Sequence, residues 1–313
     1  MRFSIYQDSK KGGRKVNQDR MGYLYTRDSL LMVVADGMGG HARGEIASEL
    51  TLQTIAELFQ RHAKPMLTDP AAFMEEAILA SHRGLHSYRA EHSLPEAPRT
   101  TVVVCVIQQG LAMWAYAGDS RLYLIRGGRI AARTVDHSRV HHLVSSGLIS
   151  DEDAKDHPER NRIYNCVGAY VAPTVEVSHP MALHSGDVIM LCTDGLWGAL
   201  QDRQIIDAFS DRTVMRAVPD LVSEALEAAG ADADNCTAVA MAWAGAEAVD
   251  MVPPTDAPVS TLAIPDGGVA TTIQFRRPGE ELGSELTDDQ IDEAVDEIQR
   301  AIHRSTKLVD DAS

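Results

Sequence analysis

The stretch VADGMGGH, residues 34–41, places an aspartate and three glycines directly behind the apolar run Leu31–Ala35. The same pattern, an apolar run that ends at an aspartate, recurs at GDSR (118–121) and at TDG (193–195). Short apolar runs bounded by Gly and Asp predict buried strands. We therefore expect core strands to carry these carboxylates to one rim of the fold, although they lie far apart in the sequence.

Two further motifs complete the set, RKVNQD (14–19) and DN (234–235). Converging carboxylates repel one another, so a cluster of them needs cations. Ligands that are all oxygen suit Mg²⁺ or Mn²⁺ better than zinc or copper. Each motif alone has an ordinary interpretation, because Asp-Gly is a common turn and Asp-Asn can be a loop or a cap. Their joint occurrence at strand ends favours a metal centre.

The rest of the chain alternates strand-like and helical segments. Gly127-Gly128 separates Leu122–Arg126 from Arg129–Arg133 and predicts a two-residue hairpin. Strand pairs joined by short turns favour antiparallel sheets with helices on their outer faces. Further strands are predicted at Val102–Ile107, Leu111–Ala117, Val188–Cys192 and Cys236–Trp243, and helices at 44–62, 70–90 and 212–229.

Composition limits the classes of protein to consider. The chain has 313 residues, of which 44% are hydrophobic, enough to fill a core. Its four cysteines form no Cys-x-x-Cys pair, which argues against a disulfide framework or structural zinc and fits a reducing cytoplasm. No signal peptide or membrane-spanning stretch is evident. A net charge of −16 disfavours nucleic acid, so we predict a cytoplasmic protein with no nucleic-acid or membrane partner.

The composition changes after Gly245. Residues 1–245 are predicted to form the folded body, and 246–285, rich in Pro, Thr, Ala and Gly without periodicity, a flexible linker. The charge is also uneven, because residues 246–313 carry 15 acidic and 5 basic side chains.

The acidic tail, residues 286–313, contains a predicted short amphipathic helix from Asp288 to about Arg304, opened by a capping box. Its narrow apolar stripe either binds a partner protein or folds back onto the body. We favour the partner, because an apolar stripe is costly to leave exposed. Deletion of residues 246–313 is then expected to leave metal-dependent hydrolysis intact.

These motifs, in this order, resemble the PPM family, the metal-dependent Ser/Thr protein phosphatases of the 2C type, in their compact bacterial form. The resemblance runs from about Tyr6 to Trp243. It implies an α+β fold, a four-layer α-β-β-α sandwich of two antiparallel sheets flanked by helices. Its most specific pieces are VADGMGGH (34–41), GDSRLYLIRGGRI (118–130), CTDGLW (192–197) and DNCTAV (234–239), and residues 143–161 resemble the family's flap segment.

The resemblance also implies an activity, the hydrolysis of phosphoserine and phosphothreonine in phosphorylated proteins by a metal-bridging hydroxide. Two Mn²⁺ or Mg²⁺ ions would be bridged by Asp36, with the Gly37 carbonyl on one ion and Asp194 and Asp234 on the other. Asp19 would hold metal-bound water. The enzyme would oppose a bacterial-type Ser/Thr kinase.

Two further site residues come with this resemblance. Arg14 would bind the phosphate oxygens with its guanidinium fork, the alternative being a solvated residue in a basic run. Asp119 would join Asp194 at a third metal ion, the alternatives being an ion pair with Arg121 or a turn cap.

Some residues depart from the family pattern. Met38 stands where many eukaryotic members have a general-acid His, so a metal-bound water or His41 would protonate the leaving group. Asn165 stands where Arg is usual, which predicts altered substrate contacts near the flap. His137 and His141, spaced i, i+4, could bind zinc on a helix, but no third ligand is near and we predict a solvated helix face.

Two other functions stay open. A pseudophosphatase that serves as a binding scaffold typically lacks one of the metal aspartates, whereas Asp36, Asp194 and Asp234 are all present here. A phosphatase of small phosphate esters would use the same chemistry, and the sequence separates it poorly from a protein phosphatase.

Overall fold

The computed structural model describes residues 1–38, 43–150, 153, 157–159, 162–245, 259–261 and 268–273. They all belong to the first of two compact units, Met1–Phe275, and the second unit is Arg276–Ser313. The predicted tail helix therefore lies outside the described residues. No helix in the described part of the chain is both long and apolar enough to cross a membrane.

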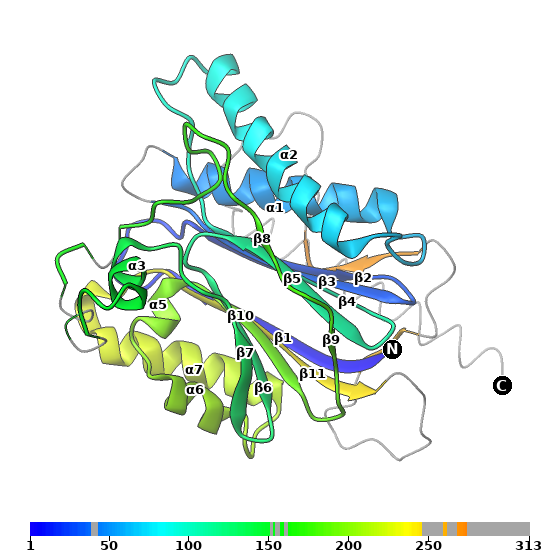
Figure 1. Ribbon diagram of the computed structural model, residues 1–313. Coiled ribbons are helices and arrows are strands. Elements are labelled where there is room, and N and C mark those ends of the chain that lie inside the picture. Colours follow the sequence, from blue (N-terminus) through cyan, green and yellow to red (C-terminus); the bar gives the residue numbers. More distant parts are fainter. Residues whose placement is uncertain are drawn as a thin grey trace, which may run out of the picture. The chain divides into compact units, whose positions relative to one another are not determined.

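Two antiparallel sheets form the centre of the first unit (Figure 1). Their apolar inner faces meet in a core that includes Phe3, Met32, Trp114 and Met241. One sheet has the order β12 (Val259–Ser260), β1 (Arg2–Lys10), β11 (Cys236–Gly245), β10 (Val188–Cys192), β6 (Arg121–Arg126) and β7 (Arg129–Arg133). The other has the order β13 (Ala270–Thr271), β2 (Asp19–Tyr25), β3 (Ser29–Asp36), β4 (Val102–Gln108), β5 (Leu111–Ala117) and β8 (Glu176–Val177), with β9 (Met181–Ala182) also on β5.

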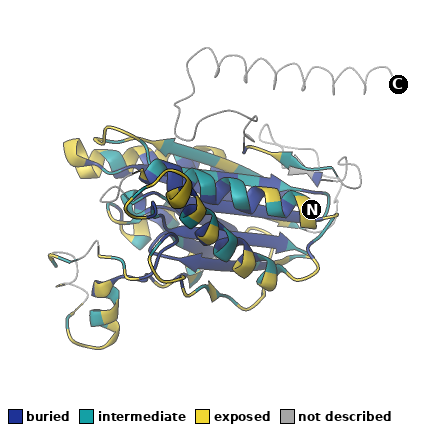
Figure 2. Cartoon of the chain, turned by 90° about the horizontal axis from the view of Figure 1, so that it is seen from above, coloured by how far each residue is buried: buried dark blue, intermediate teal, exposed yellow. Residues whose placement is uncertain are grey.

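Helices cover the outer face of each sheet, which completes the expected four-layer α-β-β-α sandwich. Figure 2 shows the strands buried beneath helices whose outward faces are exposed. On the β3 side lie α1 (Gly44–His62) and α2 (Pro70–Glu91), and on the β10 side lie α5 (Asp194–Trp197), α6 (Asp202–Ala208) and α7 (Val214–Ala229). A short helix, α3 (Arg139–Ser145), follows β7.

Several local features follow directly from residue type. Gly127 and Gly128 have φ of 55° and 70°, the left-handed conformation that a tight two-residue hairpin turn requires and that glycine adopts without strain. Gly230 has φ of 69° and ends α7, as the sequence predicts. The hairpin and the helix end are thus confirmed.

The interpretation of residues 246–285 as a linker is incomplete. Within this range β12 pairs with β1 and β13 pairs with β2, so the chain adds a strand to the edge of each sheet. The amino group of Met1 donates to the Thr261 hydroxyl at 2.9 Å, and that hydroxyl donates to the Arg27 carbonyl at 2.6 Å. Short strands of this kind depend on the partner edge and leave little periodicity in the sequence.

We therefore expect two truncations to differ. A chain that ends at residue 275 should unfold like the full chain, whereas one that ends at residue 245 should lose roughly 2–4 kcal/mol of unfolding free energy. The cause is the loss of the edge pairing and of Ile273, whose side chain is buried. Urea denaturation followed by circular dichroism measures the difference, and equal stability of the two truncations would contradict it.

Gly22 offers a matched control for this edge contact. A Cβ at Gly22 would lie 2.4 Å from Cγ1 of Ile273, so the glycine makes room for that side chain. Gly22→Ala should destabilise the chain that ends at residue 275 but not the chain that ends at residue 245. Such a difference would assign the effect to the Ile273 contact rather than to strand β2 itself.

Candidate metal centre

Asp19 and Asp36 face each other across two neighbouring strands. Asp19 begins β2 and Asp36 ends β3, and the two are direct register partners. The backbone at Asp36 is firmly held, since its carbonyl accepts from the Thr101 amide at 2.9 Å and from the Thr100 hydroxyl at 2.7 Å. The prediction that core strands deliver these carboxylates to one rim therefore holds for this pair.

Gly37 follows Asp36 at a point where no side chain fits. Its amide donates to the Gln18 carbonyl at 3.1 Å. A Cβ at Gly37 would lie 2.2 Å from the carbonyl oxygen of Gly44, the first residue of α1. The glycine thus allows three segments to meet next to Asp36, and it leaves its own carbonyl free of a bulky side chain.

Asp194 and Asp234 come from the opposite sheet. Asp194 opens α5 just behind β10, and Asp234 stands just before β11, the strand that pairs with β10. A Cβ at Gly195 would lie 2.0 Å from the Asn235 carbonyl oxygen, so glycine is needed here as well. The two carboxylates thus lie at the same end of adjacent strands.

Asn235 ties the loop that carries Arg14 to this end of the sheet. Its side-chain oxygen accepts from the Gln18 amide at 2.8 Å, and its side-chain nitrogen donates to the carbonyls of Lys11 and Val16 at 2.8 and 3.1 Å. Sequence reasoning missed this role. The only signal was an amide next to Asp234 in the DN motif.

Asp19 has one carboxylate oxygen fixed and one without a partner. Oδ2 accepts from the Thr193 hydroxyl at 2.8 Å, whereas Oδ1 is buried and makes no hydrogen bond. Burial, followed by repulsion from Asp194 and Asp234, raises the pKa of Asp19 to about 7. A buried acceptor that lacks a donor is costly, so this oxygen is suited to a water or a cation.

The remaining carboxylates also repel one another. Burial and then the nearby Asp19, Asp194 and Asp119 raise the pKa of Asp36 well above its usual value. Burial and then Asp234 raise the pKa of Asp194 to about 6, although a hydrogen bond with the Asp36 carboxyl lowers it. Such shifts mark a cluster of buried acids that divalent cations would stabilise.

The donors fit Mg²⁺ or Mn²⁺, because every one of them is an oxygen. Within the described ranges, no three His, Cys, Asp or Glu side chains form a closed set of metal ligands. The acids instead pair with each other and with Arg14. The match to a metal site thus rests on the unpartnered Asp19 oxygen and the shared repulsion, not on a finished coordination shell.

Arg14 lies on the rim of this cluster. Its guanidinium donates to Oδ2 of Asp234 at 2.6 Å. That hydrogen bond, followed by the charge of Asp234 and those of Asp194 and Asp36, raises the pKa of Arg14. Arg14 is thus both solvated, with 56% of its side chain exposed, and ion-paired to the acid cluster.

Asp119 follows β5 and is almost fully buried. Burial and then Asp194 raise its pKa well above the usual value. Arg121 makes its hydrogen bonds elsewhere, because its Nε and Nη2 donate to the two Asp136 oxygens at 2.8 and 2.7 Å. Arg121 thus forms its ion pair with Asp136, while Asp119 lies near enough to Asp194 and Arg121 for the first charge to raise its pKa and the second to lower it.

Other predicted residues are placed differently. His41 lies outside the described residues. His137 is buried one residue before the N-cap Ser138, not on a solvated helix face, so that prediction is wrong for His137. The four cysteines are free and buried.

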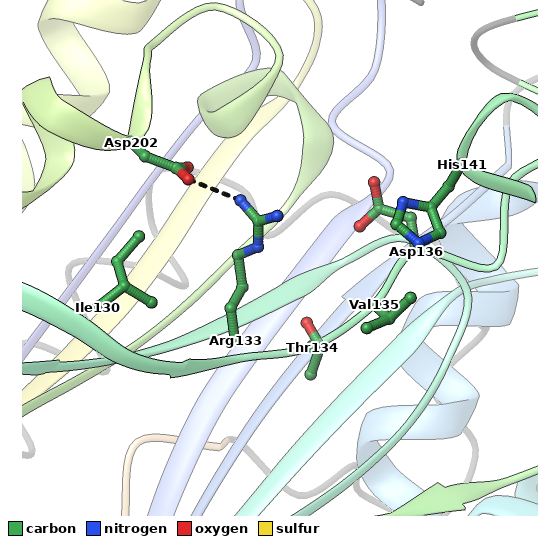
Figure 3. A pocket seen from close by; sticks show the side chains of 7 residues that line it. All are labelled: Ile130, Arg133, Thr134, Val135, Asp136, His141 and Asp202. Atoms are coloured by element: carbon green, nitrogen blue, oxygen red, sulfur yellow. Dashed lines mark hydrogen bonds and ion pairs between the residues drawn. The ribbon is translucent and has the colours of Figure 1, made fainter. Parts of the chain in front are cut away.

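A cavity of about 380 Å³ lies beside β7, α3 and α6 (Figure 3). Arg133 and Asp202 lie on its rim and form an ion pair at 2.7 Å, and His141 and Asp136 also line it. None of the predicted metal residues lines this cavity. Its lining residues are Ile130, Arg133, Thr134, Val135, Asp136, His141 and Asp202.

Comparison with known proteins gives consistent matches. A family model described as "Protein phosphatase 2C" matches residues 7–230. The "Serine/threonine phosphatase stp" of Listeria monocytogenes is 28% identical over 70% of this chain and 88% of its own length. The "Serine/threonine protein phosphatase PstP" of Mycobacterium tuberculosis is 32% identical over 74% of this chain and 43% of its own length.

A solved structure also matches this chain. The catalytic domain of PstP "in complex with 2 Manganese ions" aligns with a TM-score of 0.66 and 28% identity, over 78% of this chain and 99% of that one.

Proposed function

This chain belongs to the protein phosphatase 2C family of metal-dependent Ser/Thr protein phosphatases, and from that premise we propose how its own residues carry out the reaction. It is a hydrolase that acts on phosphorylated proteins. We propose that two Mn²⁺ or Mg²⁺ ions would be held by Asp36, which would serve both, by the Gly37 carbonyl at one ion, and by Asp194 and Asp234 at the other. The solved PstP domain with two manganese ions supports that number.

The observation that carries this proposal is the buried acid cluster with its unpartnered Asp19 oxygen. When bound, two divalent cations lower the pKa of the attacking water and neutralise charge on the phosphate. Oδ1 of Asp19 is placed to accept a hydrogen bond from a water in the site, since Thr193 fixes its other oxygen. Asp19 thus orients water rather than binding metal directly.

Arg14 is proposed to exchange its partner when substrate arrives. It and Asp234 are both partly exposed, with side chains 56% and 36% accessible, so their ion pair contributes only about 0–1 kcal/mol. A phosphate dianion offers the guanidinium two acceptor oxygens at once. Arg14 would therefore leave Asp234 for the substrate, and Asp234 would then be free to bind a cation.

The leaving oxygen of serine or threonine needs a proton. Met38 has no proton to give, and Asp119 is proposed as a ligand of a third cation together with Asp194 rather than as an acid. We propose that water in the site supplies the proton. An inactive scaffold is disfavoured because all three metal aspartates and the Asp19 acceptor are present.

The chain's wider role follows from this chemistry. We propose that it opposes a Ser/Thr kinase and that the acidic tail, residues 286–313, binds a partner protein or the body through its apolar stripe.

Metal removal tests the proposal directly. Turnover of a phosphothreonine peptide should fall to background in EDTA and return with Mn²⁺ or Mg²⁺, because the acid cluster is without counter-charge when no cation is present. The peptide should be preferred over a small aryl phosphate in kcat/KM. Activity that persists in EDTA would exclude the metal mechanism, and a reversed substrate preference would favour the small-ester alternative.

A further inference from the structure

His137 is the centre of a buried hydrogen-bond network that the mechanism does not use. Its side chain is 3% exposed and lies parallel to the Tyr116 ring, with centroids 5.0 Å apart. Nδ1 lies 3.1 Å from the Gly118 amide and 2.8 Å from the side-chain nitrogen of Asn165, and Nε2 lies 3.0 Å from Oε1 of Glu176. The His137 ring thus has hydrogen-bond partners at both of its nitrogens and an aromatic ring stacked on it.

Neighbouring groups fix the orientation of each member. The Asn165 side chain bonds Thr174 twice, accepting from its amide at 3.0 Å and donating to its carbonyl at 2.8 Å. If the Asn165 amide were flipped, its nitrogen would face the Thr174 amide, and two donors would meet. The Asn165 nitrogen must therefore face the Thr174 carbonyl and His137. Nδ1 therefore is the acceptor, its one lone pair shared by Asn165 and Gly118, and the ring proton sits on Nε2, which donates to Glu176.

The network leads to the turn that carries Asp119. His137 binds Gly118 twice, because its ring accepts from the Gly118 amide and its own amide donates to the Gly118 carbonyl at 3.0 Å. Gly118 has φ of 122°, and a Cβ there would lie 2.5 Å from Thr101. The carbonyl of Asp119 accepts from the Trp197 indole at 3.0 Å. The turn is thus held on both sides of the Asp119 side chain.

The same network reaches the segment that follows the flap. The Tyr164 amide donates to the His137 carbonyl at 3.0 Å, and Ser138 pairs with Ile163 as an isolated bridge. Asn165 is the side chain that continues this ladder to the ring of His137. Asn165 stands where the family pattern usually has Arg. Its side-chain amide hydrogen-bonds the His137 ring at this position.

We propose that Asn165 and His137 are positioning residues that set the Asp119 carboxylate through Gly118 and link it to the segment 162–165. The inference rests on the proposed function in one respect, the role of Asp119 at a third cation. Partners that orient a ligand from behind typically change metal affinity by roughly 10–100-fold when they are removed. Asn165 and His137 touch no substrate in this scheme.

Asn165→Asp is the sharpest test, because it keeps the shape and replaces the donor to Nδ1 by an acceptor. Isothermal titration with Mn²⁺ alone should show the weakest site weakened about tenfold and the tighter sites unchanged. In the metal-free protein near neutral pH, nitrogen NMR should show the His137 ring as the Nε2–H tautomer in wild type and a changed ring signal in the variant. For the phosphopeptide, the fall in kcat should be larger than the rise in KM.

Two controls keep the test decisive. Ile205→Val, at a buried position on α6, should lower Tm without changing Mn²⁺ affinity, which separates positioning from loss of stability. If Asn165→Asp fails to fold, Glu176→Ala serves instead. The Glu176 side chain is 52% exposed, and its loss should weaken the same site in the same direction.

The outcomes separate the two proposals. Wild type without Mn²⁺-dependent turnover would defeat the proposed function. Wild type with such turnover, beside a folded Asn165→Asp protein whose weakest Mn²⁺ site is unchanged or whose sites all weaken equally, would overturn the positioning role.

Discussion

Replacing Asp36 by Asn is expected to lower kcat for a phosphothreonine peptide by roughly three orders of magnitude, on the order of 4 kcal/mol of transition-state stabilisation. The charges of Asp19 and Asp194, which come from opposite sheets, both act on Asp36, and Asp36 is proposed to hold both cations. An amide offers one oxygen and no charge, so it cannot hold both. The measurement is initial-rate kinetics at saturating Mn²⁺.

The same substitution should stabilise the metal-free protein at alkaline pH. The pKa of Asp36 is raised well above its usual value, first by burial and then by neighbouring acids. A carboxyl with a raised folded-state pKa gives its full stabilisation below the unfolded pKa, and this is lost as pH rises through the folded pKa. Wild type in EDTA should therefore lose Tm as pH rises through the raised pKa values of this cluster, about 6 for Asp194 and about 7 for Asp19, and Asp36→Asn should lose less.

A matched surface aspartate serves as the control. Asp220 on α7 pairs with Arg212 at 2.8 Å, and both side chains are about half exposed. Asp220→Asn should leave turnover and the pH dependence of Tm unchanged. An Asp36→Asn protein that keeps its turnover, or that is less stable than wild type in EDTA at about pH 8, would contradict the role given to the acid cluster.

The strands that position this site were predictable because each is a run of apolar residues with a turn residue at its end. Leu111–Ala117 and Val188–Cys192 were predicted with the bounds that the structure has. Buried strands of a two-sheet core are covered on both faces, so nearly every residue in them is apolar. The carboxylates that follow stand out against such runs, which is why Asp36 and Asp194 could be proposed from sequence.

Contacts between segments far apart in sequence could not be predicted. His137 and His141 have helical spacing, but the cap at Ser138 places His137 before the helix, where it meets Gly118 and Asn165. The strand Ala270–Thr271 is too short to show a period and is stabilised by the edge of β2. In both cases the structure depends on a contact with a strand edge or a turn that is distant in the sequence. Such a contact leaves no pattern in the segment itself.

Arg14→Ala is expected to lower kcat/KM for the phosphopeptide about a hundredfold, ~3 kcal/mol, because two charge-assisted hydrogen bonds to the phosphate are lost. Arg14→Lys should recover only part of this, since an ammonium cannot bind two oxygens as a fork. The alanine variant should bind Mn²⁺ at least as tightly as wild type. Its Asp234 carboxylate no longer has the guanidinium 2.6 Å away as a competitor.

Lys15 provides the matched control, because it is the neighbouring cation in the same basic run and is exposed. Lys15→Ala removes one positive charge but leaves the Arg14 guanidinium in place. It should therefore change kcat/KM little, and only by weakening the screened electrostatic attraction between the protein and the phosphate. If Arg14→Ala and Lys15→Ala lowered kcat/KM equally, Arg14 would contribute only its positive charge. A loss confined to Arg14, together with unweakened Mn²⁺ binding, would mean that the guanidinium serves the phosphate, and that its ion pair with Asp234 is the arrangement that substrate displaces.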